Sequence, residues 1–353
     1  MTDSQIAAAF FLQIAVILLA CRSVGWLARQ VGQPQVVGEM VAGFLLGPSL
    51  FGALAPSFQA LVFPPDTVRV LFVVSQLGLA LYMFCVGLEF RPDLMLEHAR
   101  RAAAVSIAGI AVPFALGGVF GYALLQSGGF FTGAVQPLHA ALFVGAAMAI
   151  TAFPMLARII YDRGIAGTAL GTLALAAGAM DDAAAWIIMA VVLGSFSGST
   201  TLAVVAAAGA ALYVLMALAV RPLFTKLNDA AMRQGAVPSW MLASTLCALA
   251  AGAWFTDVVG IHSVFGAFIL GAAMPRGVLS RELQRLVEPV TTALLVPLFF
   301  VYSGLNSQLG LLNSAALWSV AAAVFAAACV GKGVACWAAA RATGSSPRDA
   351  LCV

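Results

Sequence analysis

The sequence is a succession of apolar runs, each about as long as a lipid bilayer is thick. Because an α-helix rises 1.5 Å per residue, about 20 apolar residues cross the roughly 30 Å hydrocarbon core of a membrane. Gly, Pro and charged residues separate the runs. The pattern predicts an all-α polytopic membrane protein with eleven spans, at about 5–27, 34–51, 67–88, 101–126, 137–158, 166–194, 200–224, 238–256, 259–275, 286–305 and 312–340.

Composition supports this class. The chain is 63% hydrophobic and 9% charged, whereas soluble domains are about 25% charged. Its net charge of +3 is too small to indicate a nucleic-acid partner. The six cysteines lie far apart without metal-binding spacing and are interpreted as packing residues, so no cofactor is expected.

The charged side chains also predict the orientation in the membrane. Lys and Arg accumulate in cytoplasmic loops. If the N-terminus lies outside, the loops after the odd-numbered spans are cytoplasmic, and they hold 15 of the 17 basic residues. The two exceptions are Arg69 and Lys332. The sequence therefore predicts an integral membrane protein with its N-terminus outside, in a bacterial inner membrane.

Two adjacent aspartates, Asp181 and Asp182, interrupt the apolar run at 173–194. Each costs about 2.5 to 3.5 kcal/mol at the centre of a spanning helix. Successive residues point about 100° apart around a helix, so one carboxylate can face a cavity while the other meets a neighbour. Lys332, in the last span, is the expected partner in charge, because a buried ammonium needs a carboxylate. Ionisable residues inside a membrane indicate a functional site by default.

The preceding span contains a second signal. In AAMAITAFPMLARII, Pro154 follows Thr151, Ala152 and Phe153 in mid-span, where proline removes a backbone donor. Broken helices at membrane depth occur where a cavity or protein satisfies the freed groups, and their ends serve as ion sites. A static polar pair of Asp181 with Lys332, with Asp182 bonded to backbone or hydroxyl groups, stays open as the alternative.

Six blocks of sequence carry a resemblance: QPQVVGEMVAGFLLGPSLFG, LGLALYMFCVGLEF, ITAFPMLARII, AMDDAAAW, GAFILGAAMP and PLFFVYSGLN. In this order they resemble monovalent cation:proton antiporter family 2, the sodium or potassium to proton exchangers of the cation:proton antiporter superfamily. The resemblance implies an inverted-repeat fold of thirteen helices, of which about eleven are present, with the two C-terminal helices missing. It also implies a homodimer.

The resemblance further implies one transmembrane exchanger domain over 1–353. Its mobile core would hold the helices at about 101–194 and 312–353, and its scaffold those at about 5–88 and 200–305. Asp182 would carry the cation and the proton, as a transient ligand of Na⁺ or K⁺. Asp181 would pair with Lys332 for coupling, and the first broken helix would lie at Thr151–Pro154, with Thr151 close to the ion.

These observations predict secondary active antiport of Na⁺ or K⁺ against H⁺ by alternating access. Burial favours the neutral form of a carboxylate, so that proton and cation compete for its oxygens. An ATP-driven pump is disfavoured, because VGKGVACW lacks the spacing and hydroxyl of a phosphate-binding loop. Intramembrane aspartyl proteolysis is disfavoured because adjacent residues of one helix cannot share a water, so no enzyme is expected. A cation channel or an efflux protein without tight proton coupling stays open.

Overall fold

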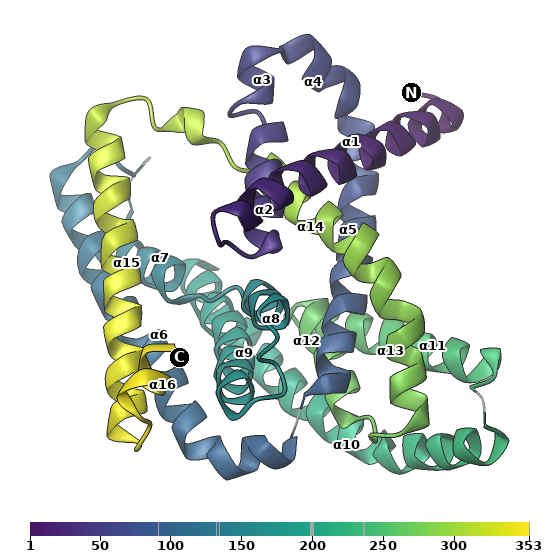
Figure 1. Cartoon of the computed structure of the whole chain (residues 1–353). Helices are drawn as coiled ribbons and strands as arrows, with labels where there is room; N and C mark the ends of the chain where they lie inside the picture. The colour runs from purple at the N-terminus through teal and green to yellow at the C-terminus, as the bar shows by residue number, and fades with distance from the viewer. Residues whose placement is uncertain (91, 132, 134, 198–200, 236, 353) are drawn as a thin grey trace. The chain divides into compact units, whose positions relative to one another are not determined.

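The computed structural model describes residues 1–353 except 91, 132, 134, 198–200, 236 and 353. Every regular element among these described residues is helical (Figure 1). In chain order the elements are α1 (Asp3–Gln30), α2 (Gln35–Leu46), α3 (Phe51–Leu54), α4 (Pro56–Val62), α5 (Pro65–Glu89), α6 (Pro92–Ser127), α7 (Pro137–Ala149), α8 (Phe153–Asp162), α9 (Ala169–Ser197), α10 (Thr201–Gln234), α11 (Ser239–Val258), α12 (Ser263–Ala273), α13 (Val278–Val290), η1 (Thr291–Leu295), α14 (Val296–Leu305), η2 (Leu309–Leu311), α15 (Ala315–Ala342) and α16 (Pro347–Cys352).

The all-α polytopic fold class is confirmed. Within the described ranges, ten helical segments are long and apolar enough to cross a membrane. They match ten of the eleven predicted spans. The span predicted at 259–275 contains α12, which has 11 residues and is shorter than any of the ten spanning segments. A helix of that length rises only about 16 Å, roughly half the thickness of the hydrocarbon core.

The chain divides into two compact units, each described by itself. Unit 1 contains Met1–Leu88, Val220–Ala250 and Ala267–Asn313. Unit 2 contains Glu89–Ala219, Ala251–Gly266 and Ser314–Val353. The division into a mobile core and a scaffold stays a prediction.

The core of unit 1 forms where α1, α2, α5 and α14 contribute fully buried apolar side chains, among them Ile17, Ala42, Leu71 and Leu298. Glycine permits the close approach of α2 and α14. A Cβ atom at Gly43 would lie 2.9 Å from the carbonyl oxygen of Phe300, closer than real Cβ contacts. This helix pair therefore depends on the missing side chain at Gly43.

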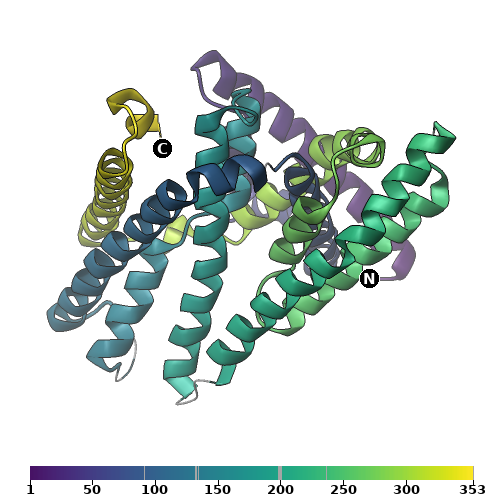
Figure 2. The same cartoon turned by 90° about the horizontal axis from the view of Figure 1, so that it is seen from below.

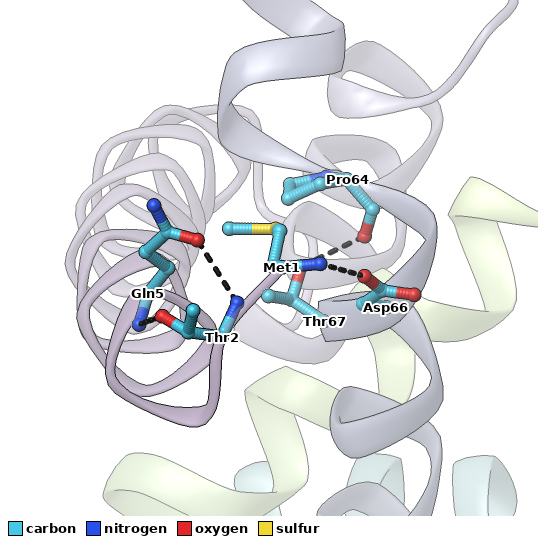
Figure 3. Close-up of polar contacts among 6 residues, drawn as sticks. All are labelled: Met1, Thr2, Gln5, Pro64, Asp66 and Thr67. Atoms are coloured by element: carbon cyan, nitrogen blue, oxygen red, sulfur yellow. Dashed lines mark hydrogen bonds and ion pairs between the residues drawn. The ribbon is translucent and has the colours of Figure 1, made fainter.

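The first turn of α1 is fixed by polar groups (Figure 3). The Thr2 hydroxyl accepts from the Gln5 backbone N–H at 3.4 Å, and the Gln5 side chain accepts from the Thr2 N–H at 2.9 Å. This reciprocal capping satisfies donors that have no partner inside the helix. The ammonium of Met1 lies 3.2 Å from Asp66 Oδ2, so the start of α1 is anchored beside the start of α5.

Unit 2 is built around α6, which packs against α7, α9 and α15. Figures 1 and 2 show α15 running alongside α6. On α6, a Cβ atom at Gly117 would lie 2.6 Å from the carbonyl oxygen of Val144 on α7. The absence of a side chain at Gly117 thus allows α7 to pack closely on α6, and this packing positions the end of α7 within unit 2.

Candidate functional site

The apolar segment Pro137–Asp162 of unit 2 is not one continuous helix. α7 ends at Ala149, the residues Ile150, Thr151 and Ala152 lie outside any helix, and α8 begins at Phe153. Ile150 has extended backbone angles, φ −63° and ψ 131°. Phe153 and Pro154 belong to the first turn of α8 rather than to the interruption. Proline is tolerated there, because the first backbone N–H groups of a helix have no intrahelical acceptor.

The interruption supplies a polar contact to Lys332. The carbonyl groups at the end of a helix lack intrahelical donors and carry partial negative charge. Ala149, the last residue of α7, accepts a hydrogen bond from Lys332 Nζ at 2.9 Å. The ammonium also donates to Thr151 Oγ1. The end of α7 and the interruption after it therefore supply two hydrogen-bond acceptors to Lys332 Nζ.

Asp181 supplies the negative charge beside Lys332. Its Oδ2 lies 3.5 Å from Lys332 Nζ. Thr151 Oγ1 donates a hydrogen bond to the same oxygen at 3.0 Å. The structure thus brings together Asp181 from α9, Lys332 from α15 and Thr151 from the interruption, and the threonine hydroxyl bridges the two charged groups. Opposite charges in contact reduce the cost of burying both.

One oxygen of Asp181 has no bonded partner. The side chain is only 8% exposed, and its Oδ1 makes no hydrogen bond to any residue that the structure describes. Asp181, Thr151 and Lys332 line a cavity of about 560 Å³ in unit 2. A buried acceptor without a donor is costly. A proton, a water molecule or a cation at Oδ1 would remove that cost.

Asp182 is placed differently from its neighbour. It is half-buried and does not line this cavity. It makes no hydrogen bond or ion pair to another residue within the described ranges. The 100° between successive residues of a helix accounts for the separation of the two carboxylates. The structure therefore groups Asp181, Thr151 and Lys332, and leaves Asp182 outside the group.

Three groups at this site were missed by the sequence analysis. The Ala149 carbonyl follows from the interruption, since helix ends leave carbonyl groups free. Cys336 lines the cavity; its position four residues after Lys332, on the same face of α15, was the available signal. Gly109 of α6 had no signal in the sequence. A Cβ atom there would lie 2.9 Å from Cys336 Sγ, 3.7 Å from Lys332 Cε and 3.9 Å from Asp181 Oδ2.

Comparison with known proteins identifies the family. Residues 13–353 match the model of the transmembrane sodium/hydrogen exchanger family. Over 345 residues the chain is 37% identical to the Na⁺/H⁺ antiporter NhaS4 of Synechocystis, covering 96% of this chain and 83% of that protein. It is 33% identical over 326 residues to cation/H⁺ antiporter 18 of Arabidopsis thaliana, covering 91% of this chain but only 40% of the relative.

A solved structure has a similar fold. The sodium proton antiporter MjNhaP1 from Methanocaldococcus jannaschii matches with a TM-score of 0.61 at 16% identity, over 98% of this chain and 81% of that one. At this identity the match shows the fold alone, and it confirms the antiporter-like fold expected from the sequence. The family and the fold are those of an integral membrane transporter rather than of an enzyme. The chain therefore belongs to the transmembrane sodium/hydrogen exchanger family.

Proposed function

We propose that this protein exchanges a monovalent cation, Na⁺ or K⁺, for H⁺ by alternating access. The observation that carries the proposal is the contact of Asp181, Thr151 and Lys332 beside an interrupted helix, at the wall of a cavity. Polar groups in this arrangement are expensive inside a membrane and mark ion pathways. The names of the two relatives, an Na⁺/H⁺ antiporter and a cation/H⁺ antiporter, point in the same direction.

In this mechanism Asp182 is the group for which cation and proton compete. Its oxygens make no hydrogen bond or ion pair to any other described residue, so they are available to a ligand. Carboxylate oxygens suit hard cations, and burial makes protonation of a carboxylate easier. Binding of one ligand excludes the other, and this exclusion couples the two fluxes. Backbone groups near Thr151 would assist the cation in the state that brings them to Asp182.

Asp181 and Lys332 have a separate role in the proposal. The ammonium is held by Asp181 Oδ2 and the Ala149 carbonyl, so a movement of α9 or of the end of α7 changes its surroundings. Release of the proton from this pair would accompany binding of the cation at Asp182. The alternative of a static polar pair predicts instead that replacing Asp182 changes stability but leaves exchange intact.

The test measures proton movement in proteoliposomes that contain the purified protein and a pH-sensitive dye. Addition of Na⁺ or K⁺ should move protons in the opposite direction, and Asp182→Asn should abolish the signal. Asp229→Asn is the matched control, because Asp229 is an exposed carboxylate on α10. Retained pH-dependent exchange in Asp182→Asn would refute the role of this residue. Cation flux without proton movement would indicate a channel or an uncoupled efflux protein.

The orientation and the assembly are further parts of the proposal. The positions of the basic residues support an N-terminus on the outer face of a bacterial inner membrane. An impermeant thiol reagent should then label Ser4→Cys in intact cells and Gln234→Cys only after lysis. The reverse pattern would contradict this orientation. The resemblance to the antiporter family supports a homodimer, which cross-linking in the membrane would detect as a species of twice the monomer mass.

A further inference from the structure

Cys336 is a soft donor atom in a cavity whose other polar groups are hard. It lies one helical turn after Lys332 on α15 and lines the same cavity of about 560 Å³ as Asp181 and Lys332. Among the described residues the thiol makes one hydrogen bond, a weak one to the carbonyl oxygen of Val105 at 3.9 Å. Little therefore holds the sulfur in its present orientation, and a ligand in the cavity can compete for it.

Asp181 supplies a second donor beside the sulfur. Its Oδ1 has no hydrogen bond to any described residue, although the side chain is 92% buried, since 8% is exposed. Gly109 shows how closely the two groups approach. A Cβ atom at that position would lie within 4 Å of both Cys336 Sγ and Asp181 Oδ2. The hydrogen at Gly109 therefore leaves space beside both groups that a side chain at this position would fill.

We propose that Cys336 Sγ and the Asp181 carboxylate form a binding site for a soft monovalent cation such as Ag⁺ or Cu⁺, and that such an ion blocks the cavity. Thiolate ligands select soft metal ions, whereas carboxylate and carbonyl oxygens suit hard ones. The cation forms a bond to sulfur and the thiol proton leaves to water, so one positive charge replaces another.

A monovalent soft ion differs from the proposed substrates in chemistry but not in charge. Because its charge is the same as theirs, it can enter the cavity as Na⁺ or K⁺ would. Once there it is held by sulfur, which Na⁺ and K⁺ do not bind well. The site would thus bind Ag⁺ as an inhibitor rather than as a substrate. The inhibition rests on the proposed exchange function, whereas the binding itself does not.

The binding test uses silver nitrate in chloride-free buffer and follows the alkylation of each cysteine by N-ethylmaleimide with mass spectrometry. Cys329 is the matched control, because it lies on the same helix and is exposed. Cys336 should be half-protected at a silver concentration at least tenfold lower than Cys329. The Asp181→Asn variant should lose most of this difference. Equal protection of the two cysteines, or an unchanged difference in Asp181→Asn, would overturn the site.

The inhibition test uses the proteoliposome assay, with each variant compared with its own rate without silver. Wild type and Cys329→Ser should lose exchange at the same silver concentration. Cys336→Ser should need at least tenfold more, and Cys336→Ala serves if the serine variant does not fold. Equal sensitivity of the Cys336 variants and wild type would refute the inhibitory site. If wild type shows no exchange, the proposed function fails, and the alkylation test still decides the binding.

Discussion

Replacement of Lys332 by Ala tests whether the ion pair stabilises unit 2. The change removes the ammonium that lies 3.5 Å from Asp181 Oδ2 and 2.9 Å from the Ala149 carbonyl oxygen. Asp181, whose side chain is 8% exposed, then keeps a buried charge with only Thr151 as donor. Removing one partner of a buried pair costs about 3 to 5 kcal/mol. Because 26% of the Lys332 side chain is exposed and water reaches it, the lower value is expected.

The loss has an upper limit set by protonation. Neutralising an ordinary aspartate at pH 7 costs about 4 kcal/mol, so the variant can take up a proton rather than lose more than this. In chains of 150–250 residues, 1 kcal/mol shifts the unfolding midpoint by about 2 to 4 °C, and the shift is smaller in a chain of 353 residues because the entropy of unfolding grows with length. We expect Lys332→Ala to lower the apparent midpoint in detergent by roughly 5 °C at pH 7, measured by tryptophan fluorescence. The loss should shrink as the pH falls, because protonation then becomes easier.

Two further variants make this test specific. Lys226→Ala is the matched control, since this lysine is exposed on α10, and it should leave the midpoint unchanged. The double variant Lys332→Ala with Asp181→Asn removes both charges and should recover most of the lost stability. If Lys332→Ala is as stable as Lys226→Ala, or if the double variant is less stable than the single one, the reasoning from the buried pair is refuted.

Glycines in α6 give two further predictions, both measured by the same thermal assay. Gly109→Ala should destabilise the protein, because its Cβ would lie 2.9 Å from Cys336 Sγ. This is expected although alanine favours a helix over glycine by about 1 kcal/mol. Cys336→Ala in the same chain should relieve the clash, and a Gly109→Ala variant more stable than wild type would contradict the prediction. Gly117→Ala should lower the stability by about 1 to 3 kcal/mol, because the new Cβ forces α7 away from α6. Gly118→Ala is the control and should have no such effect, since the atom nearest to its Cβ would be 3.8 Å away. Equal effects of the two variants would show that the close packing of α6 and α7 is unimportant for stability.

Much of the fold could be predicted, because a membrane restricts what a chain can form. Apolar runs of about 20 residues must become helices, since backbone groups find no partners in lipid. Ten of the predicted spans are such helices, and α12 is the exception in length. Periodicity and composition do not fix where an apolar helix ends. That boundary depends on turns such as the one at Gly260, where φ is +86°.

The candidate site was only partly visible in the sequence. Asp181 and Lys332 were noticeable because charge is rare in apolar runs, and the structure places them 3.5 Å apart. Pro154 marked a disturbance, yet the residues outside the helices are Ile150, Thr151 and Ala152. Proline fits the first turn of the following helix, and the preceding residues leave the helix instead. The roles of Asp182 and Thr151 in ion binding stay predictions.

The sequence by itself determined the class of the protein, because hydrophobic length, the positions of basic residues and rare buried charges follow directly from the solvation of each residue type. Only the tertiary structure decided which groups meet. Gly109, Cys336 and the Ala149 carbonyl are ordinary in the sequence, and they become part of one site because α6, α7 and α15 pack together in unit 2. Such contacts join residues as far apart as Val105 and Cys336, which are separated by 231 positions, and no local pattern records them.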